Sequence, residues 1–359
     1  PFLFLLIARL KYWIFCMRHG SFFWFILPSM TAMLLLIALP IASVFVQSLY
    51  VEHPQVLKVT KNCDPFGCKE QTTIDVIATQ KLKSVAPLGQ FNGFGTYTNR
   101  NHLAFEQIGT IRSNSNNLME FFSGLLNLPL YKALAFTLSY TFIVTPLVIV
   151  LGLAVALAVN ALPKIIKGPT IFASLLPMIV TPLIGSLVLF WMIDAEGIIG
   201  ATLQMIFDNP DLSLKASPTL TWITLFIYGI WHSSPFSFIV FYAGLQTIPK
   251  DTIEAAKIDG ASRWQSVRYV VIPYMAPLVT FILLMQLMDN FRVFEPIVGF
   301  SAEAHATSLS WIIYNDLRGQ DIKLFGSAAA TSMLTIIGVA ILLTPVLIRT
   351  WRQFNRKSV

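Results

Sequence analysis

Ionisable side chains inside one long apolar stretch near the C-terminus could contact a polar solute. Asp289, Arg292 and Glu295 follow one another at intervals of three residues, which places them along one face of a helix. On a helix that begins near Pro277, Asp289 lies about 18 Å and Glu295 about 27 Å from the start. Charged groups in a membrane segment are costly and usually face a cavity or a partner chain. We therefore expect this face to border a polar path or a second subunit.

The candidates for solute contacts are polar and aromatic residues of this stretch and of two earlier ones. They are Asp289, Asn290, Arg292, Phe294, Glu295, Trp191 and Trp231. A few polar groups among aromatic faces are typical of a small-molecule site. Two alternatives stay open. The three charged residues could instead pair with one another and with a neighbouring subunit, and Trp191 could anchor a span end at the membrane surface.

A second group of informative residues lies in the polar segment before this stretch. Asp251 with Glu254 three residues later is typical of a helix start, and Ser262 with Gln265 fits a capping box. Gly260, between these pairs, can take the positive φ that ends a helix. The segment is therefore predicted to form two short helices joined at Gly260.

The second of these helices has one apolar face, because Trp264, Val267 and Val271 recur at helical spacing. It is predicted to end before Pro273. Small residues would let another protein surface approach the helix pair closely, namely Ala255, Ala256, Gly260 and Ala261. The physical chemistry leaves two interpretations open, a docking site for another protein and a simple connection between two spans.

The elements that position these residues are membrane helices. The chain has 359 residues, of which 55% are hydrophobic and 12% charged, against roughly 25% charged in soluble domains. Apolar runs close to the ~20 residues that cross a bilayer recur along the chain. The predicted spans are 22–49, 133–160, 171–193, 219–243, 276–300 and 326–348. The predicted fold class is an all-α polytopic membrane protein with a six-span core in the lipid bilayer.

Basic residues lie mainly on alternate segments between these spans. Four such segments contain Arg9, Lys11 and Arg18, then Lys164 and Lys167, then Lys250, Lys257, Arg263 and Arg268, and finally Arg349, Arg352, Arg356 and Lys357. The positive-inside bias places these segments and both termini in the cytoplasm. The net charge of +7 does not indicate nucleic acid as a partner, because the basic residues do not gather with aromatic platforms on one soluble domain.

The long polar stretch between the first two spans is predicted to form a small mixed extracytoplasmic domain. Alternating runs at Gln55–Thr60 and Thr73–Ala78 favour strands. Leu118–Leu128 has apolar residues at helical spacing and is predicted to lie along the outer membrane surface. Cys63 and Cys68 fall in this domain, where the compartment permits a disulfide, and two free thiols are the alternative.

These features divide the chain into five predicted segments. They are a cytoplasmic segment 1–21, span 22–49, an extracytoplasmic domain with an interfacial helix at 50–130, a five-span core at 131–348 with its cytoplasmic loop at 244–275, and a cytoplasmic tail 349–359.

Patterns typical of an enzyme are missing from the sequence. No G-x-x-x-x-G-K-[ST] run occurs, so the phosphate-binding loop of an ATPase is absent and energy would have to come from another chain. His232-Ser233-Ser234 has no carboxylate placed to orient the histidine, which argues against a nucleophilic enzyme. The histidines lack the spacing of metal ligands, so no metal site is predicted at His19, His53, His102, His232 or His305.

The cytoplasmic loop resembles the EAA motif of permeases in bacterial ABC importers. The matching runs are Glu254-Ala255-Ala256, Asp259-Gly260-Ala261 and Ile272-Pro273. In that family the motif forms a coupling helix that docks into a cleft of a separate ATPase subunit. The resemblance therefore implies that Glu254 and Gly260 are the principal coupling residues, with Ala255, Ala256, Asp259 and Arg263 beside them.

Other runs resemble the carbohydrate branch of this permease family. They are Phe94-Gly95-Thr96-Tyr97, Leu245-Gln246-Thr247-Ile248-Pro249, Phe291-Arg292-Val293-Phe294-Glu295 and Phe325-Gly326-Ser327-Ala328-Ala329-Ala330. The sequence departs from that branch at three places. Phe136 stands where an asparagine is usual, Glu295 where an aspartate is common, and Val298-Gly299-Phe300 where a Thr-Gly-Gly-Pro run often occurs.

The resemblance implies a type I ABC importer permease that works by alternating access and moves a sugar, an oligosaccharide or a related polyol. It implies as partners a second permease, expected to be a homologue in a heterodimer, an extracytoplasmic solute-binding protein, and two ATPase subunits that hold ATP and Mg²⁺. The expected location is the bacterial inner membrane. The alternatives are a permease for glycerol phosphate or another non-sugar solute, and a secondary transporter, which would be expected to show internal repeats.

Overall fold

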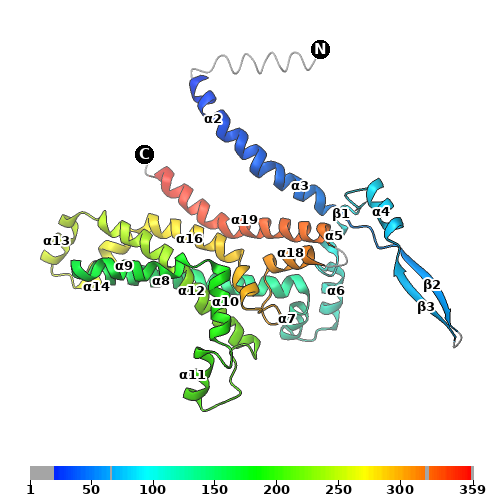
Figure 1. The fold of residues 1–359 in the computed structure, drawn as a ribbon. Helices are drawn as coiled ribbons and strands as arrows, with labels where there is room; N and C mark the ends of the chain where they lie inside the picture. The colour runs from blue at the N-terminus through cyan, green and yellow to red at the C-terminus, as the bar shows by residue number, and fades with distance from the viewer. Residues whose placement is uncertain (1–19, 65–66, 320–322, 357–359) are drawn as a thin grey trace. The chain divides into compact units, whose positions relative to one another are not determined.

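The computed structural model describes residues 20–64, 67–319 and 323–356 (Figure 1). The chain divides into two compact units, 1–93 and 94–359. The predicted segment 50–130 is therefore divided at Gly93, because the residues that follow pack with the helices of the second unit.

The first unit begins with one long apolar helix. It consists of α2 (Gly20–Met33), the π-helical turn η1 (Leu34–Ala38) and α3 (Leu39–Ser48). Pro40 lacks the N–H that would donate to the preceding turn, and the wider turn of η1 lies just before it. The stretch Trp24–Ser48 is apolar and long enough to cross a membrane, in agreement with the first predicted span.

Two antiparallel strand pairs and a helix complete this unit. They are β1 (Tyr50–Val51) with β4 (Gln90–Phe91), the hairpin of β2 (Leu57–Asp64) and β3 (Gly67–Ile74), and α4 (Val76–Val85). The strand predicted over Thr73–Ala78 is wrong beyond Ile74. The Asp75 carboxylate accepts a hydrogen bond from the Ala78 N–H (3.0 Å) and caps α4, which stabilises the helix start by about 1 kcal/mol.

Cys63 and Cys68 face each other in the register of the β2–β3 hairpin. Their side chains lie outside the described part of the structure. The disulfide therefore stays a prediction, as does the position of these strands outside the membrane.

The second unit is mainly helical. Its elements are α5 (Gly95–Thr98), α6 (Phe105–Asn114), α7 (Leu118–Leu126), α8 (Pro129–Asn160), α9 (Lys164–Ile179), α10 (Pro182–Met192), α11 (Ile198–Phe207), α12 (Pro218–Gln246), α13 (Lys250–Ile258), α14 (Arg263–Ser266), η2 (Val267–Val271), α15 (Ile272–Tyr274), α16 (Ala276–Phe291), α17 (Glu295–Gly299), α18 (Leu309–Arg318) and α19 (Phe325–Arg356). Helix α7 agrees with the helix predicted at Leu118–Leu128. Its position along the membrane surface stays a prediction.

Among the described residues, four helices are long and apolar enough to cross a membrane, and six spans result if each of two bent helix pairs counts as one. The predicted number of spans is therefore consistent with the structure, and two of the six spans are bent helix pairs. The helices α9 and α10 meet at 92°, and Arg263–Tyr274 meets α16 at 68°. The bends follow from Pro182 and Pro277, because proline cannot donate to the preceding turn.

Helices α8 and α12 form the centre of the second unit, where glycine allows a close approach. A Cβ atom on Gly152 would lie 2.5 Å from Cβ of Ser237 and 2.9 Å from the backbone nitrogen of Phe238. Nearer the start of the same two helices, the buried aromatic residues Phe136 and Tyr140 of α8 pack against Trp222 and Phe226 of α12. Small residues at helix crossings are the usual solution in membrane proteins, since lipid supplies little hydrophobic force between helices.

A buried histidine ties the start of the second unit to its last helix. His102 is fully buried, and its Nδ1 donates to the Asn99 side-chain oxygen (2.8 Å). Its Nε2 lies 3.1 Å from the Thr331 hydroxyl and 3.2 Å from the Ser327 carbonyl of α19. Burial lowers the pKa of His102 below its usual 6.5, although the Ser327 carbonyl and the Asp316 carboxylate oppose this shift.

This lowered pKa predicts a loss of stability in acid. The unfolded chain binds a proton at His102 before the folded chain does, so the contribution of His102 is complete above pH 6.5 and is lost as the pH falls below it. We expect the melting temperature of the wild type in detergent to fall between pH 8 and pH 5, and that of His102→Gln to fall less. Equal acid sensitivity of both proteins would contradict this assignment.

Candidate functional site

The predicted helix pair of the cytoplasmic loop is present as α13 and α14, and Gly260 joins the two helices. Its φ is +81°, and the N–H of Gly260 donates to the Lys257 carbonyl (3.0 Å) while that of Ala261 donates to the Ala256 carbonyl (3.0 Å). These two bonds form a Schellman motif, in which glycine takes the left-handed position at lowest cost. The predicted capping box of Ser262 and Gln265 is also confirmed.

Two details of this loop differ from the prediction. Asp251 and Glu254 do not cap α13, because Pro249 occupies the N-cap position and has no side-chain cap. The second helix does not end before Pro273. It continues through the π-helical η2 to Tyr274, where the wider turn accommodates Pro273, which has no N–H to donate to the carbonyl four residues earlier.

One face of α13 is anchored in the protein and the opposite face is free. Ala256 is buried, and Ile253 packs against a core cluster that includes Val271. By contrast, 86% of Ile258 and 68% of Trp264 is exposed. We use the name coupling surface for nine of the exposed residues of α13, α14 and their connection: Asp251, Glu254, Ala255, Lys257, Ile258, Asp259, Gly260, Arg263 and Trp264.

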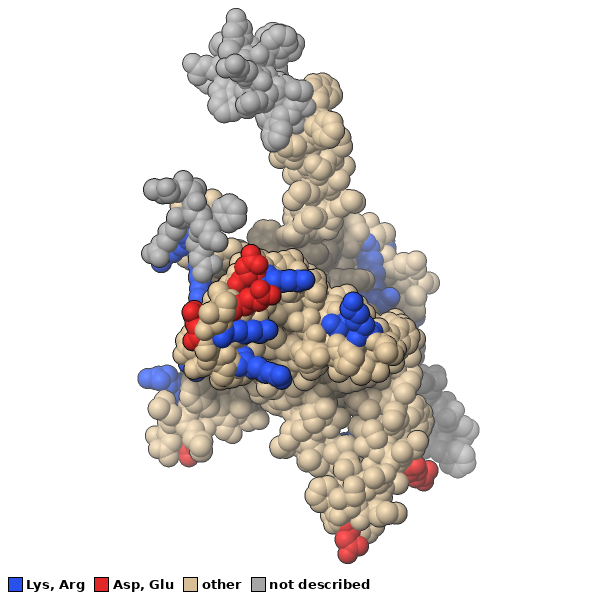
Figure 2. Space-filling model, turned by 90° about the vertical axis from the view of Figure 1, so that its left-hand side faces the viewer, with Lys and Arg blue, Asp and Glu red and all other residues tan. Residues whose placement is uncertain are grey.

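The coupling surface combines apolar and charged groups. Figure 2 shows acidic and basic side chains side by side on the face seen from the α13–α14 end of the molecule. Large exposed apolar groups surrounded by charges are typical of a protein interaction site. These features are the ones expected of a docking site, and the docking role of this surface stays a prediction.

The solute candidates of the fifth span do not form the ladder that was predicted. Asp289 and Arg292 form an exposed ion pair (3.0 Å), but α16 ends at Phe291 and Glu295 begins a separate helix, α17. The break is explained by Pro296, which cannot donate to the Arg292 carbonyl as a continuous helix would require. The prediction of one helix face carrying all three charges is therefore wrong.

Asn290 is not directed toward an open path in this conformation. It is buried, and its amide donates to the Thr145 hydroxyl of α8 (2.9 Å) and to the Gln286 side chain (3.4 Å). A buried amide with these partners stabilises the contact between α8 and α16. In this structure Asn290 is a packing residue.

The aromatic candidates lie on three separate elements. Phe294 makes an edge-to-face contact with Tyr314 of α18 (5.1 Å between ring centroids). Trp191 is 65% exposed near the end of α10, and Trp231 is 48% exposed on α12. The structure therefore does not gather the seven candidates into one site, and their role as solute contacts stays a prediction.

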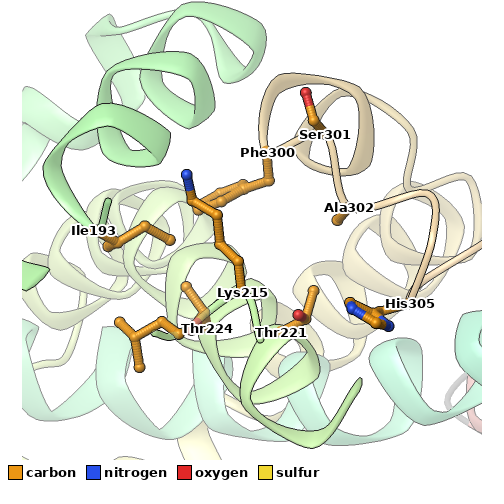
Figure 3. A pocket seen from close by; sticks show the side chains of 9 residues that line it. Ile193, Lys215, Thr221, Thr224, Phe300, Ser301, Ala302 and His305 are labelled. Atoms are coloured by element: carbon orange, nitrogen blue, oxygen red, sulfur yellow. The ribbon is translucent and has the colours of Figure 1, made fainter. Parts of the chain in front are cut away.

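A small cavity lies at the end of α10, beside the loop that leads to α12 (Figure 3). It has a volume of about 30 Å³ and is lined by Ile193, Leu214, Lys215, Thr221, Thr224, Phe300, Ser301, Ala302 and His305. This space holds one or two water molecules and no sugar. The Lys215 ammonium donates a hydrogen bond to the Asp194 carboxylate (2.8 Å). This bond holds the pKa of Asp194 below its usual value. The same ammonium nitrogen lies 3.3 Å from the centre of the Phe190 ring.

Sequence reasoning missed the polar contacts at the bend between α9 and α10. The Tyr228 hydroxyl donates to the Pro182 carbonyl (2.7 Å), and Nε2 of His232 lies 3.2 Å from the Val180 carbonyl. Pro177 and Pro182 in the sequence were a signal of a bend in this span, because neither residue has an N–H to donate to the carbonyl four residues earlier. No pattern showed which side chains of another span would reach the backbone at this bend.

Among the described residues, no group of three or more histidine, cysteine and carboxylate side chains could hold a metal ion.

Known proteins resemble this chain over most of the second unit. The family model for the inner membrane component of binding-protein-dependent transport systems matches residues 121–353. A probable ABC transporter permease of Pyrococcus horikoshii is 32% identical over 46% of this chain and 58% of its own length. The trehalose/maltose transport system permease protein MalF of Thermococcus litoralis is 28% identical over 56% of this chain and 68% of its own length.

A solved structure shares the fold. The bacterial ABC transporter that imports the acidic polysaccharide alginate has a chain that aligns with a TM-score of 0.57 at 19% identity, covering 69% of this chain and 88% of that one. The matched region 121–353 contains α8 to α18, most of α19 and the EAA-like run on α13. This multi-pass membrane chain therefore belongs to the family of inner membrane components of binding-protein-dependent transport systems, which are the permeases of ABC importers.

Proposed function

We propose that this chain is the permease subunit of an ATP-driven importer for a carbohydrate. The observation that carries the proposal is the coupling surface, at one end of a permease fold. There Gly260, with its positive φ, joins α13 to α14, and Ile258 and Trp264 on either side of it are exposed. The relative named for trehalose and maltose transport and the sequence runs typical of sugar permeases support a carbohydrate as the solute.

The coupling surface would dock on a separate ATPase subunit. Ile258 would fill an apolar pocket of that subunit, while Glu254, Asp259 and Arg263 would fix the orientation through their charges, which supports specificity more than affinity. ATP and Mg²⁺ would be bound by two such subunits, so this chain would not itself be an enzyme. The coupling surface and both termini would then lie in the cytoplasm.

The remaining partners follow from the same mechanism. A second permease, a homologue of this chain, would complete the pore, and a solute-binding protein would deliver the sugar on the opposite side of the bacterial inner membrane. Closure of the ATPase subunits would move α13 and α14, and through η2 and α16 it would shift the spans between the inward-open and outward-open states. The bends beside α10 and α16 are sites where such a change needs few broken backbone bonds.

The test is to purify the tagged chain from its native membrane and to reconstitute what copurifies with it. We expect two ATPase subunits and a second permease. With the binding protein and ATP, labelled maltose or trehalose should enter the vesicles. Uptake of labelled glycerol phosphate alone would replace the sugar with that solute. Solute uptake that is driven by an ion gradient without ATP would contradict the proposal.

A further inference from the structure

The third span contains a break that is held together by side chains of another span. Helix α9 ends at Ile179 and α10 begins at Pro182, with Val180 and Thr181 in extended conformations between them. The two helices meet at 92°. The Val180 carbonyl, at the C-cap of α9, has no helical N–H partner, because the chain leaves the helix here. Inside a membrane such groups need other donors, because lipid offers none.

Two residues of α12, one helical turn apart, donate to the backbone at this break. The Tyr228 hydroxyl donates to the Pro182 carbonyl (2.7 Å), and Nε2 of His232 lies 3.2 Å from the Val180 carbonyl. Because a carbonyl oxygen only accepts, Nε2 of His232 carries a hydrogen atom. The two rings also stack on each other, with 5.7 Å between centroids and 26° between planes. The pair therefore forms one rigid unit on α12.

The neighbouring residues are small where this pair touches α10. A Cβ atom on Gly185 would lie 2.8 Å from the Tyr228 hydroxyl oxygen, so only glycine lets the hydroxyl approach α10. On another side of α10, the Ser186 hydroxyl lies against Gly299 and within 3.4 Å of the Glu295 carbonyl. Helix α10 is thus held between α12 and α17, and the broken third span contacts the broken fifth span.

We propose that Tyr228 and His232 are positioning residues that hold this bend in place during transport. Their bonds to Val180 and Pro182 can be broken and remade without unwinding a helix, unlike the backbone bonds on either side. Helix α9 also packs against α12, so a change in the bend alters how α10 and α17 sit against the rest of the core. The inference rests on the proposed transport function, because it assigns these residues a role in the transport cycle.

The direct test measures the bend without any solute. Phe172 on α9 and Val188 on α10 are 63% and 51% exposed, so both can be replaced by cysteine and spin-labelled, with Cys16, Cys63 and Cys68 replaced by serine. The complete importer in nanodiscs should give one narrow distance distribution. Tyr228→Phe and His232→Leu should each broaden it or add a second distance. His232→Gln, which keeps an N–H donor, should restore the narrow distribution.

Transport provides the second measurement. Labelled maltose uptake should fall about tenfold in Tyr228→Phe and His232→Leu, as expected for the loss of one hydrogen-bond partner, and should recover in His232→Gln. Tyr242→Phe removes a hydroxyl from the same helix away from the bend and should transport normally. Unchanged distances in both Tyr228→Phe and His232→Leu would overturn the inference. A wild-type importer whose solute uptake is driven by an ion gradient without ATP would instead overturn the proposed function, since the distance measurement does not depend on it.

Discussion

Replacing Gly260 by proline is expected to abolish coupled transport while the chain still inserts and assembles. Proline fixes φ near −65°, whereas Gly260 has φ +81°, and it removes the N–H that donates to the Lys257 carbonyl. The lost bond and the strained backbone together cost about 2–3 kcal/mol at the coupling surface. In reconstituted importer, solute-stimulated ATP hydrolysis and labelled sugar uptake should both fall by about a hundredfold.

Gly260→Asn is the matched control for this experiment. Asparagine tolerates the left-handed conformation better than other residues with a side chain, and an added Cβ atom at this position meets no atom within 4 Å. This variant should therefore keep most of its coupled activity. Glu254→Ala should separate ATP hydrolysis from uptake without changing the helix pair. Normal solute-stimulated ATP hydrolysis in both Gly260→Pro and Glu254→Ala would show that α13 and α14 do not couple.

The largest effect on stability is expected at Gly152, in the contact between α8 and α12. In Gly152→Leu the new Cβ atom alone would lie 2.5 Å from Cβ of Ser237 and 2.9 Å from the backbone of Phe238, so the two helices must separate. Overpacking of this kind costs about 3 kcal/mol. The melting temperature of the variant in nanodiscs, followed by tryptophan fluorescence, should fall clearly below that of the wild type.

Gly109→Leu provides the comparison, because Gly109 is also in a helix, α6, and a Cβ atom there meets nothing within 4 Å. Leucine is a better helix former than glycine by about 1 kcal/mol, so this variant should melt at or slightly above the wild-type temperature. If Gly152→Leu and Gly109→Leu melt together, the close packing of α8 on α12 is not what stabilises the core.

The features that the sequence predicts best are those that depend on neighbours along the chain. Six apolar stretches, the capping box of Ser262 and Gln265, and the positive φ of Gly260 each follow from a short run of residues. The same local logic failed where two signals competed. Asp251 and Glu254 have the spacing of a cap, but Pro249 takes that position, and Asp75 starts a helix where Val76 and Ile77 favour a strand.

The features that the sequence could not predict depend on contacts between distant segments. The charged ladder failed because Pro296 divides the fifth span, so Glu295 belongs to α17. Asn290 has the chemistry of a solute contact, yet Thr145, on another helix, uses its hydrogen-bonding capacity. Likewise, His232 gave no metal or catalytic signal, and only the fold brings it to the Val180 carbonyl. Residue type indicates what a polar group can bind, while the packing of helices decides which partner it meets.

The coupling role of α13 and α14 is tested most directly by ATP-driven sugar uptake into vesicles that contain the purified importer. We predict that labelled maltose or trehalose accumulates only when the binding protein is outside and ATP is on the side of α13 and α14, and that Gly260→Pro abolishes this uptake whereas Gly260→Asn does not. Accumulation without ATP, or equal uptake by the wild type and Gly260→Pro, would contradict the claim that this chain couples ATP hydrolysis to solute transport through α13 and α14.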